Sequence, residues 1–141
     1  MFKTIVAATD GSLDGDRAFA LAQSIAREAE ARLVIVHVTE LVGGKGGVYP
    51  AAVNDDDIRH DIEAQAETLR ADGIDASAVV RAVRLGGPAH EIADVAASVD
   101  ADLIVVGTRG RSPVSGVVLG SVPVRLLHIA HRPVLVVPPA A

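Results

Sequence analysis

Residues 103–121 read LIVVGTRGRSPVSGVVLGS. The unbroken apolar run Leu103–Val106 is typical of a strand that is buried on both faces of a parallel sheet. Glycines, arginines and serines follow it at once, and a helical pattern begins near Ser121. This transition from strand to loop to helix predicts an α/β fold. The glycine-rich loop is either a flexible connection or a segment whose backbone comes close to a ligand.

The rest of the chain repeats the alternation of short Val/Ile-rich runs with amphipathic helical stretches. We expect strands at Thr4–Thr9, Leu33–Val38, Ala78–Val83, Leu103–Val106 and Val134–Val137. Helices are expected over about residues 13–31, with Ser12 as N-cap, and over about 55–71, 88–99 and 121–131. Residues 41–53 hold four glycines and are expected to form a flexible loop. Together these elements predict a five-stranded parallel sheet with helices on both faces, a three-layer sandwich of the flavodoxin or Rossmann type.

Composition narrows the class of protein. A chain of 141 residues suits one domain, here residues 1–141. Its net charge of −5 and its 2% of aromatic residues argue against a nucleic-acid partner. The chain has no cysteine, no start typical of a signal peptide and no apolar run long enough to cross a membrane. We therefore expect a cytoplasmic protein with no membrane partner.

A ligand site is expected beyond the carboxyl ends of the strands, where the strand order of an open parallel sheet reverses. Residues 9–12, with the sequence Thr-Asp-Gly-Ser, follow the first strand, and the glycine loop follows the fourth. If these two strands are neighbours, the two loops face each other. The helix beginning at Ser121 could then seat a phosphate, with Arg109 and Arg111 adding positive charge. Alternatively, the loop is only a glycine-rich connection and Ser121 caps the helix; the residues alone leave both interpretations open.

Other site chemistries fit less well. Asp10 could meet a magnesium ion that bridges phosphates, or could only cap a turn. A calcium loop starting at Asp10 is excluded, because Leu21 stands where a bidentate Glu is needed. Residues 43–46 are not a P-loop, no G-x-G-x-x-G follows the first strand, and the five histidines lack zinc-ligand spacing.

The spacing of the glycine loop is G-x-x-G, nine residues, then G-S, at Gly107, Gly110, Gly120 and Ser121. It resembles the nucleotide-binding signature of the universal stress protein family, in its ATP-binding branch. The resemblance extends over the whole chain, to residues 9–12, 37–38, 86–88 and 132–137. It implies the strand order 3-2-1-4-5, an adenine nucleotide alpha hydrolase-like fold, and ATP or AMP/ADP as ligand, with or without Mg.

The resemblance also implies which residues contact the nucleotide. Val38 and Val106 would hold the adenine, which suits a chain with almost no aromatic side chains to stack on it. Asp10 would lie near the ribose and phosphates. The complete expected set, with the two arginines, is Ala8, Thr9, Asp10, Val38, Val106, Gly107, Arg109, Gly110, Arg111, Gly120, Ser121 and Val122.

Three functions are compatible with this interpretation. The first is a nucleotide-dependent stress-response or regulatory module; the others are a slow ATPase or autophosphorylating enzyme, and an interaction module with no nucleotide. Asp10 is the only carboxylate that the sequence places in the site, so we rank binding above turnover.

The expected partner is a second copy of the chain. In the order 3-2-1-4-5 the last strand, Val134–Val137, is an uncharged edge flanked by prolines. The opposite edge carries Arg81 and Arg84, which discourage pairing. The sequence and the resemblance both predict a homodimer in which Val134–Val137 pairs antiparallel with its copy.

Overall fold

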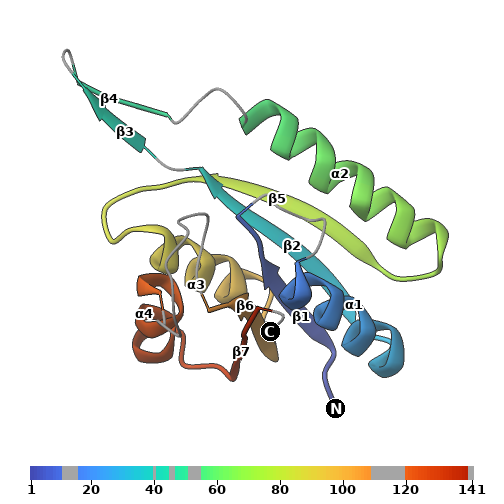
Figure 1. Ribbon diagram of the computed structural model, residues 1–141. Helices are drawn as coiled ribbons and strands as arrows, with labels where there is room; N and C mark the ends of the chain where they lie inside the picture. The colour runs from blue at the N-terminus through green and yellow to red at the C-terminus, as the bar shows by residue number, and fades with distance from the viewer. Residues whose placement is uncertain (11–15, 40, 45–46, 51–54, 109–119, 140–141) are drawn as a thin grey trace.

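The computed structural model describes residues 1–10, 16–39, 41–44, 47–50, 55–108 and 120–139. Its main sheet contains β1 (Thr4–Ala8), β2 (Arg32–Thr39), β5 (Ala76–Ala82), β6 (Leu103–Gly107) and β7 (Val134–Val137), all parallel. The strand order is β5-β2-β1-β6-β7 (Figure 1). In chain order these are the third, second, first, fourth and fifth strands of the sheet, so the predicted order is confirmed.

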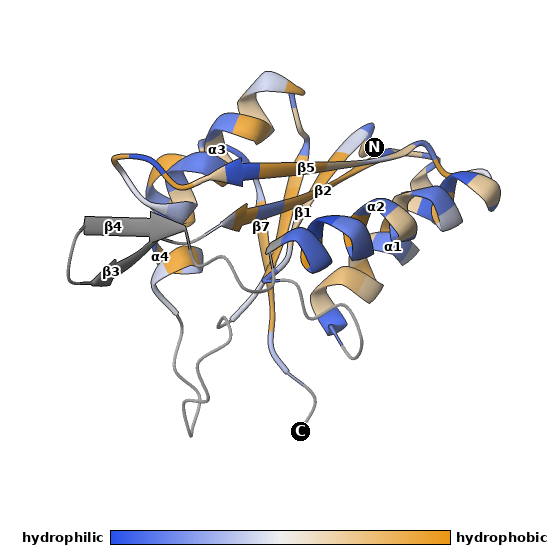
Figure 2. Cartoon of the chain, turned by 90° about the horizontal axis from the view of Figure 1, so that it is seen from above, coloured by the Kyte–Doolittle hydropathy of each residue, from blue (hydrophilic) through white to orange (hydrophobic). Residues whose placement is uncertain are grey.

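Two helices cover each face of the sheet. Helices α1 (Arg17–Ala29) and α2 (Asp55–Ala71) lie on one face, and α3 (Pro88–Ser98) and α4 (Ser121–Ile129) lie on the other. In Figure 2 the strands of the main sheet are mostly hydrophobic along their length, whereas hydrophilic residues are spread over the helices. The predicted three-layer sandwich is therefore confirmed.

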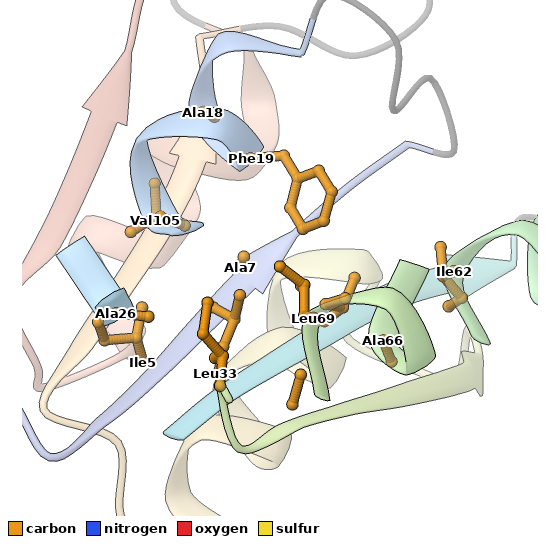
Figure 3. Close-up of a cluster of buried hydrophobic side chains, with 14 of the residues drawn as sticks. Ile5, Ala7, Ala18, Phe19, Ala26, Leu33, Ile62, Ala66, Leu69 and Val105 are labelled. Atoms are coloured by element: carbon orange, nitrogen blue, oxygen red, sulfur yellow. The ribbon is translucent and has the colours of Figure 1, made fainter. Parts of the chain in front are cut away.

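The strands are apolar at consecutive positions because both of their faces are buried. On β2, Leu33 and Ile35 join the core under α1 and α2, while Val34 and Val36 join the core under α3 and α4. Figure 3 shows the first core, where Phe19 of α1 and the inner residues of α2 approach β1 and β2. With so few aromatic rings, this packing depends on branched aliphatic side chains and alanines.

Helix α1 begins later than predicted. Asp16, and not Ser12, is its N-cap, and the Asp16 carboxylate accepts a hydrogen bond of 3.0 Å from the Phe19 backbone N–H. Aspartate is as good an N-cap as serine, and Asp16 immediately precedes the buried positions Ala18 and Phe19. The expected start at residue 13 extended the apolar periodicity too far toward the amino end.

The segment predicted as a loop over residues 41–53 contains a hairpin. Strands β3 (Leu41–Gly44) and β4 (Gly47–Pro50) pair antiparallel in a separate two-stranded sheet that projects from the end of β2 (Figure 1). Val42 pairs with Tyr49 and Gly43 with Val48, so the β-forming residues of both halves lie in the ladder. The prediction gave the four glycines too much weight.

A carboxylate fixes the amino end of the central strands. Asp102, just before β6, accepts hydrogen bonds from the backbone N–H groups of Lys3 (2.7 Å) and Thr4 (2.9 Å). Its own N–H donates to the Thr4 carbonyl at 2.8 Å. The bonds from Thr4 and Lys3 lower the pKa of Asp102, because they favour the charged carboxylate. These three hydrogen bonds hold β1 and β6 in register, with Ile5 beside Leu103.

Each of the four helices in the described residues is followed by a residue with positive φ. Gly73 takes this position after α2, but Glu30 (φ 53°), Asp100 (φ 53°) and His131 (φ 52°) take it after α1, α3 and α4. Residues other than glycine are strained in this left-handed conformation, because their Cβ atom comes close to the backbone. None of the helices in the described part of the chain combines the length and apolar character needed to cross a membrane.

We predict that Glu30→Gly stabilises the protein. Glycine removes a left-handed strain of about 1 kcal/mol, of which the greater flexibility of the unfolded chain cancels a part. Glu28→Gly is the matched control, because Glu28 lies within α1 and glycine there should destabilise by about 1 kcal/mol. Urea unfolding of the two variants should give shifts of opposite sign; destabilisation by both would contradict the prediction.

Candidate functional site

The carboxyl ends of β1 and β6 flank the place where the strand order reverses. From β1 the chain builds β2 and β5 on one side, and it then returns to add β6 and β7 on the other side. Ala7 of β1 is paired with Val105 of β6, so the two strands end side by side, and residues 9–10 and 108 follow at the same end of the sheet. This is where an open parallel sheet places its ligand.

An apolar wall lies on the α3–α4 side of this place. Val38 and Val106 are buried in the second core, with exposed fractions of 9% and 3%, and Ala8 and Val122 pack against that core. These four residues come from β2, β6, β1 and α4. The structure therefore brings together four of the residues that the sequence assigned to the nucleoside and the phosphate loop.

Helix α4 starts at the same end of the sheet. Gly120 is its N-cap, and the Gly120 N–H bonds to the carbonyl of Thr108, one residue beyond β6. Ser121 is the exposed first helical residue and Gly120 precedes it as N-cap, so the interpretation of Ser121 as N-cap is wrong. Gly120 itself has an ordinary φ of −66°. Glycine is therefore not required here for backbone conformation, and the absence of a side chain leaves space at the helix start.

Thr9 is the residue through which β1 reaches Asp10. Its N–H donates to the carbonyl of Val36 at 2.9 Å, and its hydroxyl donates to Asp16 at 3.4 Å. The Nδ1 atom of His37 lies 3.0 Å from the Thr9 carbonyl oxygen. Thr9 and His37 are buried, with exposed fractions of 8% and 5%. All three polar groups of Thr9 thus have partners, and the chain entering Asp10 is held on several sides.

Asp16 adds a second carboxylate near Asp10. Burial raises the pKa of Asp16, and the negative charge of Asp10 raises it further, while the bond from the Phe19 N–H opposes both effects. A second carboxylate that the sequence analysis did not anticipate thus lies close to Asp10.

The first turn of α1 also contacts the chain beyond β7. The Nη1 atom of Arg17 donates to the carbonyls of Pro138 (3.2 Å) and Pro139 (3.1 Å). Prolines have no N–H, so the β ladder cannot continue past Val137 in the usual way. This contact ties the segment after the edge strand to α1, the helix that follows β1 along the chain.

Arg84 was expected to discourage pairing at the edge of the sheet, but its side chain binds α3. It lies beyond the end of β5 and binds Glu91 through two bonds, Nε to Oε1 at 2.6 Å and Nη2 to Oε2 at 3.1 Å. Glu91 is almost fully buried in α3, and the Arg84 guanidinium lowers the pKa of its carboxyl. Between them, Gly86 has φ 106°, and a Cβ atom there would come within 2.9 Å of the His90 ring. Arg84 thus anchors the loop before α3 instead of protecting the edge of β5.

Some predicted site residues lie outside the described residues. They are Arg109, Gly110 and Arg111. Gly107, at the end of β6, is described and pairs with Val137.

Residues 1–138 match the universal stress protein family. The chain belongs to this family. A universal stress protein of Thermus aquaticus is 38% identical over 140 residues, which cover 97% of this chain and 99% of that protein. A solved universal stress protein from Archaeoglobus fulgidus is 28% identical with a TM-score of 0.69, covering 96% of this chain and 98% of that one. A universal stress protein solved in complex with cAMP is 28% identical with a TM-score of 0.67, covering 99% of this chain and 98% of that one.

The resemblance to universal stress proteins did not point to Asp16 or to the contact made by His37. Asp16 could have been found, because an aspartate directly before an apolar helical pattern is a usual N-cap. The partner of His37 could not, because Thr9 is 28 residues away and meets it only through the β1–β2 pairing.

We predict that Asp16→Asn stabilises the protein at neutral pH, whereas Asp16→Ala destabilises it. Asparagine keeps the cap and removes the buried charge, while alanine loses the cap at a cost of about 1 kcal/mol. Because the pKa of Asp16 is raised in the folded protein, the charged Asp16 carboxylate lowers the free energy of unfolding. This loss of stability is absent below the unfolded value of 3.8 and grows as pH rises through the folded pKa.

The advantage of Asp16→Asn should therefore shrink on acidification. Denaturant unfolding of the wild type and both variants at pH 7 and near pH 3.5 measures it. A wild type more stable than Asp16→Asn at pH 7 would show that the charge is favourable and would overturn the prediction.

Proposed function

We propose that this universal stress protein binds an adenine nucleotide, ATP in the first place, beyond the carboxyl ends of β1 and β6. The observation that carries the proposal is the meeting of an apolar wall with the start of α4 at the point where the strand order reverses. Such a wall suits a base and a helix start suits a phosphate. The similar universal stress protein in complex with cAMP supports an adenine nucleotide as the ligand class.

The proposed contacts follow from the two sides of the site. Val38, Val106 and Ala8 enclose the adenine, and Thr9 and Asp10 lie beside the ribose and phosphates. The phosphates would contact the loop and the start of α4, through Gly107, Arg109, Gly110, Arg111, Gly120, Ser121 and Val122.

A magnesium ion would enter with the phosphates. In the described part of the chain no three acidic, histidine or cysteine side chains gather as a metal site. Phosphate oxygens would therefore supply most ligands, and the Asp10 carboxylate is a hard oxygen ligand of the type that magnesium prefers.

In the cell, the nucleotide would regulate the stability or partners of a stress-response protein, which we expect to be cytoplasmic. A second candidate function is slow ATP hydrolysis or autophosphorylation. Asp16 favours it, because a carboxylate with a raised pKa near Asp10 is a candidate general base. Timed release of inorganic phosphate from ATP distinguishes the two functions.

We also propose that the protein is a homodimer joined through β7. The carbonyls of Pro133 and Val137 accept hydrogen bonds from Ile104 and Thr108, so alternate residues of β7 bond toward β6. The N–H and C=O groups of Val134 and Val136 then point to the outer edge. In the part of the chain that the structure describes no strand pairs with that edge, and a second copy could do so with two-fold symmetry.

Gly120→Val should weaken ATP binding at least about tenfold, the factor that corresponds to 1.4 kcal/mol. Valine is allowed at the observed φ of −66°, but its side chain would fill space at the start of α4 that the phosphates need. His128→Val places the same side chain at the other end of the helix and should leave affinity unchanged. Calorimetric titration with ATP measures both; equal affinity of a folded Gly120→Val and the wild type contradicts the proposed phosphate site.

Val136→Pro should convert the proposed dimer to a monomer. Proline removes the outward N–H of Val136 and keeps the N–H groups that bond to β6. Val136→Ala, which trims the side chain and retains the N–H, is the matched control and should remain dimeric. Light scattering during size-exclusion chromatography gives the masses, and a wild type that is monomeric at micromolar concentration would rule out this dimer.

A further inference from the structure

His37 is a polar side chain in an apolar layer. It lies on β2 two residues after Ile35, and it therefore shares the face that packs against α1 and α2. The side chain is 5% exposed, and its Nδ1 atom lies 3.0 Å from the carbonyl oxygen of Thr9. Because a carbonyl can only accept, Nδ1 carries the hydrogen and donates it.

We propose that His37 is a positioning residue of the nucleotide site, which orients the peptide between Thr9 and Asp10 through this hydrogen bond. The proposal rests on the proposed nucleotide binding and adds to it a residue that would not itself touch the ligand. His37 acts through the backbone of Thr9.

The geometry of the peptide bond explains the effect. In a planar trans peptide the carbonyl oxygen of one residue and the N–H of the next point in opposite directions. His37 draws the Thr9 carbonyl toward the α1–α2 face, so the Asp10 N–H is directed toward the opposite face. The apolar wall of Val38 and Val106 and the start of α4 lie on that face.

The two other Thr9 bonds described above act on different groups. The bond from the Thr9 N–H to Val36 continues the pairing of β1 with β2, and it orients the peptide before Thr9, not the one after it. The bond from the Thr9 hydroxyl to Asp16 restrains the side chain. Of these three contacts, the one with His37 acts on the peptide that leads into Asp10.

Two substitutions separate positioning from mere packing. His37→Asn keeps a donor, because the side-chain nitrogen of asparagine, like Nδ1 of histidine, is two bonds from Cβ. His37→Leu fills similar space with no donor. Arg70→Met is a control of the same kind elsewhere, since Arg70 donates to the Ala76 carbonyl at 2.7 Å at the amino end of β5.

The experiment measures two quantities for the four proteins. The first is the ¹H–¹⁵N shift of the Asp10 amide without nucleotide, together with the ¹⁵N shift that identifies Nδ1 of His37 as protonated in the wild type. The second is the dissociation constant for ATP. His37→Leu should move the Asp10 amide and raise the dissociation constant about fivefold to tenfold, the size of one hydrogen bond. His37→Asn should restore the amide shift and bring affinity within about twofold of the wild type, and Arg70→Met should change neither.

The results that would contradict the positioning role differ from those that would contradict nucleotide binding. An unprotonated Nδ1, an Asp10 amide that does not move in His37→Leu, or equal losses of affinity in His37→Leu and His37→Asn would overturn the positioning role. If the wild type itself binds no ATP, the proposed function fails. The amide shifts then still decide whether His37 orients the peptide at Asp10.

Discussion

The pairing of β1 with β6 is the contact on which the other features depend. It joins segments almost a hundred residues apart, and Asp102 secures it by accepting two backbone N–H groups at the start of β1. Without this pairing the strand order would not reverse beside β1, and Asp10 and the start of α4 would not share one end of the sheet. The same pairing leaves β7 as the outer strand on its side. The candidate site and the candidate dimer edge thus have one structural origin.

The site combines two kinds of surface that the fold produces in different ways. Its apolar wall consists of ordinary core residues, such as Val38 and Val106, that reach the end of the sheet. Its polar side includes the backbone at Thr9 and Asp10, and the Thr9 carbonyl is bonded to His37 on the α1–α2 face. Thr9 connects the two, because it leaves the apolar strand and is bonded to β2, to His37 and to Asp16. A ligand between the α3–α4 wall and Asp10 would therefore depend on packing on both faces of the sheet.

The sequence predicted the sheet well because burial on both faces leaves a strong signal. Runs such as Leu103–Val106 have no polar residues for a solvent-exposed face, so they indicate strands that are buried on both faces. Their alternation with amphipathic helices leaves few topologies. The hairpin over residues 41–50 was missed, because glycine-rich strands lack that signal. Arg84 was misassigned, because its buried partner Glu91 is identified only when α3 folds back on the loop.

The candidate site was predictable in part, for a similar physical reason. Ala8, Val38, Val106 and Val122 were found because a spaced glycine motif implied the family and its wall residues, and the structure brings them together. Asp16 and His37 were not found, since their roles arise from contacts and not from residue type. A buried histidine has no meaning for a ligand site until the strand pairing sets it beside Thr9.

The central place of β1 also has a consequence for how the chain reaches its native state. During synthesis β1 is made first and can pair with β2 as soon as residue 39 is available. Its other edge has no neighbour until β6 has been made, and β7 can only be added after that. A hydrophobic strand edge therefore stays open while most of the chain is being translated, and closing it requires contacts of high sequence separation, which form slowly. The interval before residue 107 emerges is thus the period in which the nascent chain most needs protection from aggregation.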